Sequence, residues 1–187
     1  MEVWDLYDMN RQKTGETMIR GYKIPEDRFR ISVHVAIFNG EGKMLIQQRQ
    51  STKRAFANLW DISAGGCVVS GETSQMGIQR ELFEELGIKY DFEKVRPHMT
   101  IKYDGGFNDI YVLVMDDLDI NDVTIQPTEV QAVKWATKEE IMQMIDTEEF
   151  ISLNKGFIEM LFFFTTHTGT IEGADKLPKR EYKPMPT

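Results

Sequence analysis

Acidic side chains and glycines that could build a metal site are concentrated between Gly66 and Ile88. Glu81, Glu84 and Glu85 are spaced i, i+3 and i+4, so on a helix their carboxylates converge on one patch. Like charges this close repel one another unless a cation neutralises them. Mg²⁺ prefers oxygen ligands and shares them with substrate phosphates, and Mn²⁺ is a substitute by the same ligand preference. The cluster therefore predicts a divalent-metal site that is suited to cleaving phosphate anhydrides.

The segment that carries these carboxylates is predicted to be a helix of about three turns. Thr73 or Ser74 is a suitable N-cap, and Gly87 is a suitable C-terminal stop. Arg80 lies one turn before Glu84 and can orient its carboxylate through a charge-assisted pair. The opposite, apolar side of the helix is expected to dock on a core and consists of Met76, Ile78, Leu82, Phe83 and Leu86.

The complete spacing of this segment resembles the motif of the Nudix family. That motif reads Gly-x5-Glu-x7-Arg-Glu-U-x-Glu-Glu-x-Gly-U, where U is a bulky aliphatic residue. Every defined position agrees, from Gly66 through Glu72 to Gly87, with Leu82 and Ile88 at the two aliphatic positions. The resemblance covers roughly residues 30 to 145. It implies an α/β fold, an α/β/α sandwich with a mixed sheet, in which the motif forms a loop–helix–loop.

The resemblance also implies roles for particular residues. The carbonyl of Gly66 and the carboxylates of Glu81, Glu84 and Glu85 would hold the metal, with Glu72 as a supporting carboxylate. A water activated by the metal would attack phosphorus, and a general base would take its proton. Glu84, Glu85 and Glu129 are the candidates for that base. Glu129 precedes a strand-like segment where many Nudix enzymes carry an extra acidic residue, and its alternative reading is an exposed residue at a strand start.

The rest of the chain is expected to form one Nudix domain over residues 1–167. Runs of β-branched and apolar residues predict strands at 31–38, 44–49, 109–115 and 130–135. A capping-box pattern predicts a helix that begins at Thr137. The parts of the domain are an N-terminal hairpin at about 1–29, a core at about 30–145, a C-terminal helix at about 150–166 and a loosely held tail at 168–187.

A narrower resemblance connects the chain to Nudix proteins close to isopentenyl-diphosphate isomerase. The segment Trp4–Asp8, followed by Thr14-Gly15 and Arg20-Gly21, is similar to the N-terminal hairpin of those proteins. Arg49 and Lys53 match the pair of cations that grips the diphosphate in the isomerase. Their charges suit a phosphate anhydride, and the alternative is that both are rim charges near a strand end.

The isomerase reaction itself is not favoured by the residues after Trp60. Ala64 stands where the isomerase carries its catalytic cysteine, and Cys67 stands where it carries a metal-binding histidine. A non-catalytic ligand sensor is a third reading, but such proteins usually carry a DNA-binding domain or a damaged motif. We therefore predict a Mg²⁺-dependent hydrolase that cleaves a diphosphate bond. Its substrate would be a nucleoside diphosphate linked to another moiety, or a related small organic diphosphate.

Other residues inform the choice of substrate and partner less directly. Tyr103 lies near the expected substrate mouth and could stack on a base. Cys67 is expected to be a small buried thiol, not a nucleophile. The aromatic run at 157–164 is expected to pack in the core, with a homodimer face as the alternative.

Composition excludes several classes of protein. The 187 residues carry a net charge of −8 and include 41% hydrophobic and 28% charged residues, which is typical of a globular domain. This acidic balance argues against duplex nucleic acid as a partner, since no basic stripe is present to neutralise phosphates. The single Cys excludes an internal disulfide, and no apolar run is long enough to span a membrane. The expected location is the cytoplasm.

Overall fold

A computed structural model describes residues 1–167 and 169 of the chain. The tail predicted at 168–187 lies outside these residues, apart from Gly169. The helices are α1 (Ser74–Leu86), α2 (Lys138–Asp146) and α3 (Lys155–Phe163), with a short 3₁₀ helix at Ile120–Asp122. The strands are β1 (Val3–Tyr7), β2 (Lys13–Ile19), β3 (Arg30–Phe38), β4 (Met44–Arg49), β5 (Trp60–Asp61), β6 (Ala64–Cys67), β7 (Met99–Tyr103), β8 (Gly106–Val114) and β9 (Val130–Ala136).

Strands β3 to β9 form one mixed sheet, and β1 pairs only with β2 in a separate hairpin. The order in the main sheet is β5-β4-β3-β8-β7, while β6 pairs with β3 and β9 pairs with β4. The pair β3–β8 is parallel, and the other pairs of this sheet are antiparallel. A parallel pair requires a long crossover, and here the crossover between β3 and β8 contains α1.

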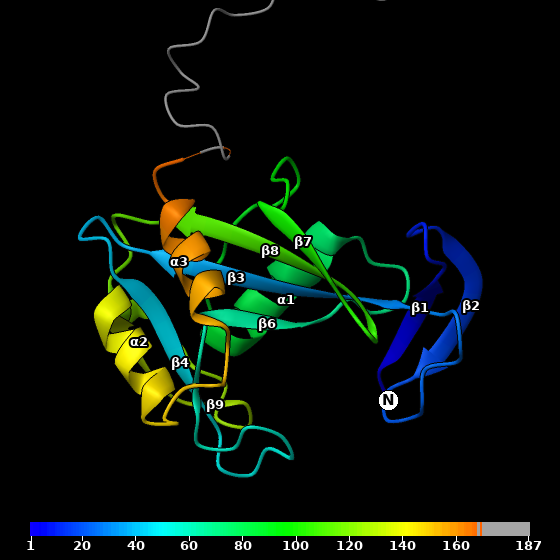
Figure 1. The fold of residues 1–187 in the computed structure, drawn as a ribbon, viewed down its shortest axis with the longest axis horizontal. Coiled ribbons are helices and arrows are strands. Elements are labelled where there is room, and N and C mark those ends of the chain that lie inside the picture. Colours follow the sequence, from blue (N-terminus) through cyan, green and yellow to red (C-terminus); the bar gives the residue numbers. More distant parts are fainter. Residues whose placement is uncertain (168, 170–187) are drawn as a thin grey trace, which may run out of the picture.

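The two faces of the sheet are covered by different helices (Figure 1). Val33, Val35 and Ile37 of β3 pack in one core with the apolar side of α1. Ala36 and Phe38 point the other way and pack in a second core with α2 and α3. This alternation follows from the two-residue period of a strand. The predicted α/β/α sandwich with a mixed sheet is therefore confirmed.

Helix α1 begins and ends where its sequence predicts. The Thr73 side chain accepts a hydrogen bond from the backbone N–H of Met76 at 3.2 Å and so caps the helix. Gly87 ends the helix in the left-handed conformation, with φ 69°, and its N–H donates to the carbonyl of Phe83. Ile78 and Leu82 are fully buried against the sheet. The caps fix which residues of the motif reach the sheet and which reach solvent.

The observed elements differ from the predicted ones in places that depend on tertiary contacts. Strand β8 begins at Gly106, three residues before the predicted strand at 109–115. The earlier start arises because β7 turns tightly into β8, with Tyr103 paired to Gly106. A side chain at position 106 would overlap the carbonyl of Arg30, so only glycine fits there. Helix α3 is shorter than the predicted 150–166, because Asn154 caps its first turn by accepting from the N–H of Gly156 at 2.9 Å. Phe150, before the cap, forms a bridge with Trp60 instead.

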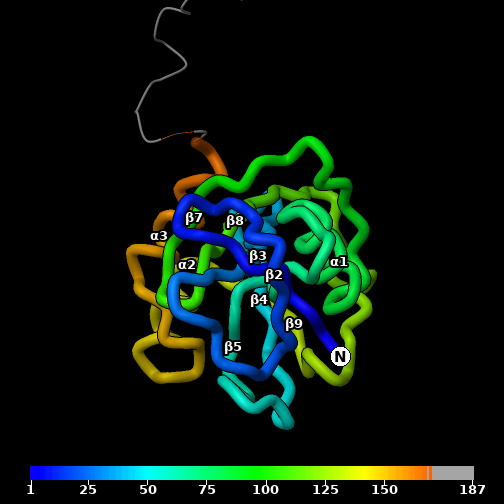
Figure 2. Tube along the Cα trace, turned by 90° about the vertical axis from the view of Figure 1, so that its right-hand side faces the viewer, coloured from blue at the N-terminus to red at the C-terminus, as the bar shows by residue number. Residues whose placement is uncertain are grey.

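The N-terminal hairpin lies at one end of the sandwich and faces the viewer in Figure 2. The buried carboxylate of Asp109 on β8 forms an ion pair with Arg11 at the turn of the hairpin. Asp5 of β1 accepts hydrogen bonds from the Ser70 hydroxyl at 2.6 Å and the Gly71 N–H at 3.0 Å. The hairpin is thereby tied both to the sheet and to the loop before α1.

Among the helices of residues 1–167, none combines the length and apolar character that crossing a membrane requires.

Candidate active site

The carboxylates of α1 open into a cavity of about 330 Å³, called here the carboxylate cavity. Residues from α1, from β6, from the end of β4 and the loop after it, from the loop before β9 and from the N-terminal hairpin meet around it. Its lining consists of Glu2, Arg20, Arg49, Lys53, Gly65, Gly66, Cys67, Arg80, Glu81, Glu84, Glu85, Gln126 and Glu129. All the residues predicted for the site line it except Glu72 and Tyr103.

Arg80 organises the acidic residues of the motif. Its guanidinium donates to Glu72 at 2.8 Å, to Glu81 at 2.9 Å and to Glu84 at 3.1 Å. It also donates to the carbonyl of Cys67 at 3.0 Å. Burial disfavours its charge, but the ion pairs with Glu72 and Glu81 outweigh this and raise the pKa of Arg80. The sequence predicted only the pair with Glu84, so Arg80 orients a wider set of groups than expected.

Glu85 is the buried member of the cluster, only 6% exposed. Its carboxylate accepts hydrogen bonds from the Gln47 amide at 2.9 Å and from the Gly65 N–H at 3.2 Å. Burial, together with the charge of Glu81, raises the pKa of Glu85 to about 8. Gln47 was not among the predicted site residues. One signal could have identified Gln47. It lies two positions after the core residue Leu45, so the two side chains share one face of the strand and Gln47 is a polar residue directed toward α1.

The groups beside Gly66 fit a hard cation by their chemistry. A side chain at position 66 would overlap the Glu81 carboxylate, so the glycine lets carboxylate and backbone approach closely. The donors that converge there are carboxylate and carbonyl oxygens, the ligands that Mg²⁺ prefers. Within residues 1–167, however, no three His, Cys, Asp or Glu side chains are already arranged to hold a metal. Arg80 pairs with Glu81 and Glu84, so a cation would compete with it for these carboxylates.

Cations from separate parts of the chain line the same cavity. Lys53 forms an ion pair with Glu129. Arg49 donates to the carbonyl of Ala55 at 3.3 Å. Arg20 of the hairpin pairs with Glu2 at 2.6 Å. Neither Arg20 nor Glu2 was predicted for the site, because nothing local in the sequence shows that the hairpin folds back onto it.

Tyr103 lies in a neighbouring cavity of about 680 Å³, called here the second cavity. Its hydroxyl accepts a hydrogen bond from Arg30 at 3.0 Å. The structure therefore does not bring Tyr103 together with the carboxylates. Arg49 lines both cavities and connects them.

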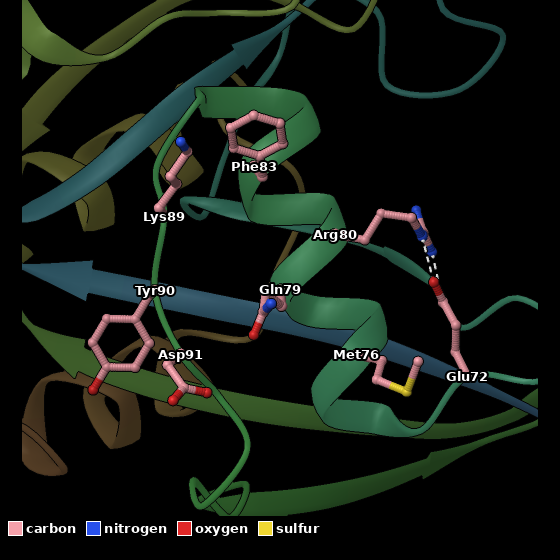
Figure 3. Close-up of a pocket in the computed structure, with 8 residues that line it drawn as sticks. All are labelled: Glu72, Met76, Gln79, Arg80, Phe83, Lys89, Tyr90 and Asp91. Carbon is pink, nitrogen blue, oxygen red and sulfur yellow. Dashed lines mark hydrogen bonds and ion pairs between the residues drawn. The ribbon is translucent and has the colours of Figure 1, made fainter.

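A groove of about 620 Å³ lies on the solvent side of α1, and Figure 3 shows the side chains that line it. Met76 and Phe83 line this groove and are 54% and 50% exposed. The prediction that these two side chains dock on the core was wrong, because they lie at the edge of the apolar arc. Arg80, paired with Glu72, lines the groove as well as the carboxylate cavity.

Cys67 lines the carboxylate cavity but is poorly suited to act as a nucleophile. Burial raises the pKa of its thiol, which disfavours the reactive thiolate.

An α/β/α sandwich whose loop–helix–loop brings three glutamates around one arginine, with a fourth glutamate buried beside them, defines a class of enzymes, the hydrolases of acid anhydrides. The model of the NUDIX domain matches residues 28–161 of this chain. The chain therefore belongs to the Nudix family and is an enzyme of that family, a hydrolase of pyrophosphate-type bonds. Nudix hydrolases act on small molecules and generally use a divalent metal.

Relatives and solved structures agree with this assignment. An uncharacterized Nudix hydrolase of Listeria monocytogenes is 42% identical over 151 residues, which cover 81% of this chain and 89% of the relative. The crystal structure of DR0079 from Deinococcus radiodurans has a TM-score of 0.68 at 25% identity and covers 86% of this chain and 97% of its own. A MutT protein from Methanosarcina mazei, with a TM-score of 0.55 and 22% identity over 79% of this chain and 100% of its own, shows the same fold.

Proposed function

We propose that this protein is a Mg²⁺-dependent hydrolase, with Mn²⁺ as a substitute metal. It cleaves a diphosphate bond in a nucleoside diphosphate linked to another moiety, or in a related small organic diphosphate. The observation that supports this most strongly is the convergence of Glu81, Glu84 and Glu85 with Arg49 and Lys53 on one cavity. Carboxylates that suit a metal and cations that suit an anhydride thus line one cavity, although they belong to different elements, and this supports the proposal.

The metal ligands in this proposal are the Gly66 carbonyl, Glu81, Glu84 and Glu85, with Glu72 supporting them through Arg80. Bound Mg²⁺ supplies Lewis acidity and lowers the pKa of a coordinated water. Arg80 keeps the carboxylates oriented, since one planar guanidinium holds several oxygens at fixed angles.

The diphosphate is bound in this proposal by the cations of the cavity. Arg49 and Lys53 lie at the end of β4 and in the loop after it, and Arg20 of the hairpin faces the same space. Lys53 is paired with Glu129, so binding an anionic substrate would exchange that carboxylate for a phosphate oxygen. The exchange would leave Glu129 available to accept a proton.

Three carboxylates are candidates for the general base. Glu84 and Glu129 have side chains 48% and 36% exposed, so water reaches both. Glu85 is buried and already accepts two hydrogen bonds. Because general-base catalysis contributes roughly 10²- to 10⁴-fold, removing the true base should lower kcat by that factor. Metal affinity should be retained only in the variant at Glu129, since Glu84 and Glu85 are also proposed metal ligands. The Glu→Gln variants at positions 84, 85 and 129 compare the three directly.

The first test is release of phosphate and mononucleotide from a panel of substrates, with Mg²⁺, with Mn²⁺ and with a chelator. The panel contains nucleoside diphosphate sugars, dinucleoside polyphosphates, nucleoside triphosphates and isopentenyl diphosphate. We expect metal-dependent hydrolysis that Glu84→Gln lowers by at least about 10²-fold without unfolding the protein. Glu139→Gln, on the exposed side of α2, is the matched control and should keep full activity. Full activity of Glu84→Gln, or activity in the chelator, would contradict the proposal.

Two alternatives remain from the sequence. An isomerase of allylic diphosphates resembles the chain in its hairpin, Arg49 and Lys53, but Ala64 offers no thiol and is buried in β6 against the α1 core. Conversion of isopentenyl diphosphate to a product of equal mass would establish it. A ligand sensor would bind diphosphates without turnover. The homodimer and the cytoplasmic location stay predictions. The aromatic residues considered for a dimer face, Phe157, Phe162 and Phe164, pack largely into the core beneath α2 and α3.

A further inference from the structure

The groove on the solvent side of α1, called here the α1 groove, lies between α1 and the segment that follows it (Figure 3). This segment runs back along the helix in the opposite direction. The ammonium of Lys89 lies 5.7 Å from the centre of the Phe83 ring. Farther along, the N–H of Phe92 donates to the side chain of Gln79 at 3.3 Å. The two walls of the groove are therefore joined by contacts along their length.

Three apolar side chains line the α1 groove and remain open to solvent. Met76 and Phe83 of α1 are 54% and 50% exposed. Tyr90, in the opposite wall, is partly buried, and its ring packs edge-on against Phe92 with the ring centres 4.9 Å apart. Met, Phe and Tyr are enriched at the centres of protein interfaces. An exposed apolar patch with a polar rim is typical of an interaction surface.

The rim of the α1 groove carries charges that residues 1–167 leave unpaired. The Lys89 ammonium lies over the Phe83 ring, and no carboxylate in this part of the chain is within ion-pair distance of it. Asp91 accepts the N–H of Glu93 at 2.9 Å, and no cation among the same residues pairs with it. One cation and one anion of the rim are thus available to a partner.

The order of these groups along the α1 groove makes it complementary to itself. Figure 3 shows an aromatic residue and the cation at one end, a methionine and the anion toward the other, and two uncharged polar residues between them: Phe83 and Lys89, Met76 and Asp91, and Gln79 and Tyr90. A two-fold axis perpendicular to α1 and level with its middle exchanges the two ends. Each cation then faces the other copy's anion, and each aromatic ring faces the other copy's methionine.

Other kinds of partner match this arrangement less well. A partner of predominantly one charge would attract one end of the α1 groove and repel the other, and like charges brought together in an interface are costly. A purely apolar partner would bury Lys89 and Asp91 without neutralising either, which is also costly. A second copy supplies the opposite charge at both ends.

We propose that the α1 groove is the interface of a symmetric homodimer, in which two copies of α1 pack antiparallel across a two-fold axis. Each Met76 contacts the other copy's Phe83, and each Lys89 pairs with the other copy's Asp91. A flexible thioether side chain adapts to irregular gaps and packs well on an aromatic ring, so it fills the hollow between the facing grooves. Two-fold dimers are the commonest soluble oligomers.

The dimer brings a second copy close to the catalytic machinery. Arg80 and Glu72 line the α1 groove, and Arg80 lines the carboxylate cavity as well. The second copy therefore shields the ion pair between Arg80 and Glu72 from water on its outer side. Because the surface is small, we expect the dissociation constant to lie in the micromolar range.

The first test is sedimentation velocity of the full chain from about 1 to about 500 µM, a range that spans micromolar association. Phe83→Gln should weaken the dimer at least about tenfold, since buried aromatic residues contribute most at interfaces. Its position is exposed, and circular dichroism verifies that the variant is folded. Met160→Gln, 37% exposed on α3, is the matched control and should dimerise like the parent. A monomer at every concentration, or a dimer that only Met160→Gln weakens, would overturn the proposal.

A charge exchange tests the two-fold geometry itself. Lys89→Glu and Asp91→Lys each bring like charges together across the axis, so each variant alone should dimerise at least about tenfold more weakly than the parent. An equimolar mixture of the two variants should associate as the parent does, because one native and one reversed ion pair form between them. Asp117→Lys, at an exposed position outside the groove, is the control and should not change association. A mixture that associates no better than its components would contradict this geometry.

These experiments are independent of the proposed function. They use no substrate, and the residues that they change lie outside the carboxylate cavity. A monomeric enzyme that hydrolyses diphosphates would overturn only the dimer. A dimer without metal-dependent hydrolysis would contradict only the proposed function.

Discussion

At the scale of the residue, the site depends on one guanidinium that serves several acceptors. Arg80 donates to Glu72, Glu81 and Glu84 and to the carbonyl of Cys67. Charged hydrogen bonds of this kind are directional as well as strong, so they fix carboxylates that would otherwise repel one another. Charge alone does not explain this arrangement, because an ammonium cannot satisfy the same acceptors from one position.

Arg80→Lys is therefore expected to be damaging although it preserves the charge. Losing bonds to buried carboxylates should lower the free energy of unfolding by about 1–3 kcal/mol and lower kcat/KM by about 10- to 100-fold. Urea denaturation and steady-state kinetics measure the two effects. Arg96→Lys, at an exposed position, should change neither. A fully active Arg80→Lys enzyme would show that the guanidinium geometry is dispensable.

At the scale of the element, the C-terminal end of α1 sets where Glu84 and Glu85 lie. Gly87 has a positive φ of 69°, and a methyl group there would lie 2.9 Å from the Cβ of Thr124. Thr124 is held in place because its N–H donates to the carbonyl of Leu86 at 2.9 Å. Both the backbone conformation and the close contact therefore require glycine.

Gly87→Ala tests this requirement, and Gly42→Ala is its matched control. Gly42 has a similar φ of 71°, but a methyl group there would meet nothing within 4 Å. Gly42→Ala should cost about 1 kcal/mol of unfolding free energy, the usual cost of a left-handed alanine. Gly87→Ala should cost about 2 kcal/mol or more, because the overlap with Thr124 adds to it. Equal losses in chemical denaturation would show that the contact is easily relieved.

Elements with a strong local signal were predictable from the sequence, and the others were not. Short sequence patterns were enough to predict three elements: the apolar run predicts β3, the capping residues predict the ends of α1, and the capping box predicts the start of α2. Strand β6 reads Ala-Gly-Gly-Cys, which has no strand preference, and it forms because it pairs with β3. In the candidate site, the motif glutamates follow from their spacing. Arg20 and Gln47 reach it only through tertiary packing, which no local pattern encodes.

At the scale of the whole molecule, the N-terminal hairpin is joined to the site through polar contacts. Asp5 accepts from Ser70 and Gly71 in the loop before α1 and from Lys13 at 2.6 Å. Burial opposes the ionised form of Asp5, but these hydrogen bonds outweigh it and lower the pKa of Asp5 below its ordinary 3.8. A carboxylate of this kind stabilises the fold above pH 3.8, and that contribution is lost as the pH falls through the lower, folded-state pKa.

Asp5→Asn should reveal this contribution as a pH-dependent difference. At pH 7 the variant should be less stable than the parent by about 1 kcal/mol, a value kept small by solvent screening of the half-exposed Lys13. The difference should shrink as the pH falls below 3.8. Urea denaturation followed by tryptophan fluorescence measures it, since Trp4 lies in the core of the hairpin. A difference that is constant from pH 7 to pH 2.5 would mean that the charge of Asp5 contributes nothing.

The alternation of β3 has a consequence for how such an enzyme changes over evolution. Its odd-numbered residues pack against α1, which carries the carboxylates, and His34 on the other face lines the second cavity. Mutations on one face can therefore accumulate without disturbing residues on the other, although both belong to a single strand. Enzymes with this sheet can therefore evolve a different substrate preference through the residues of the second cavity, while selection preserves the carboxylates of α1.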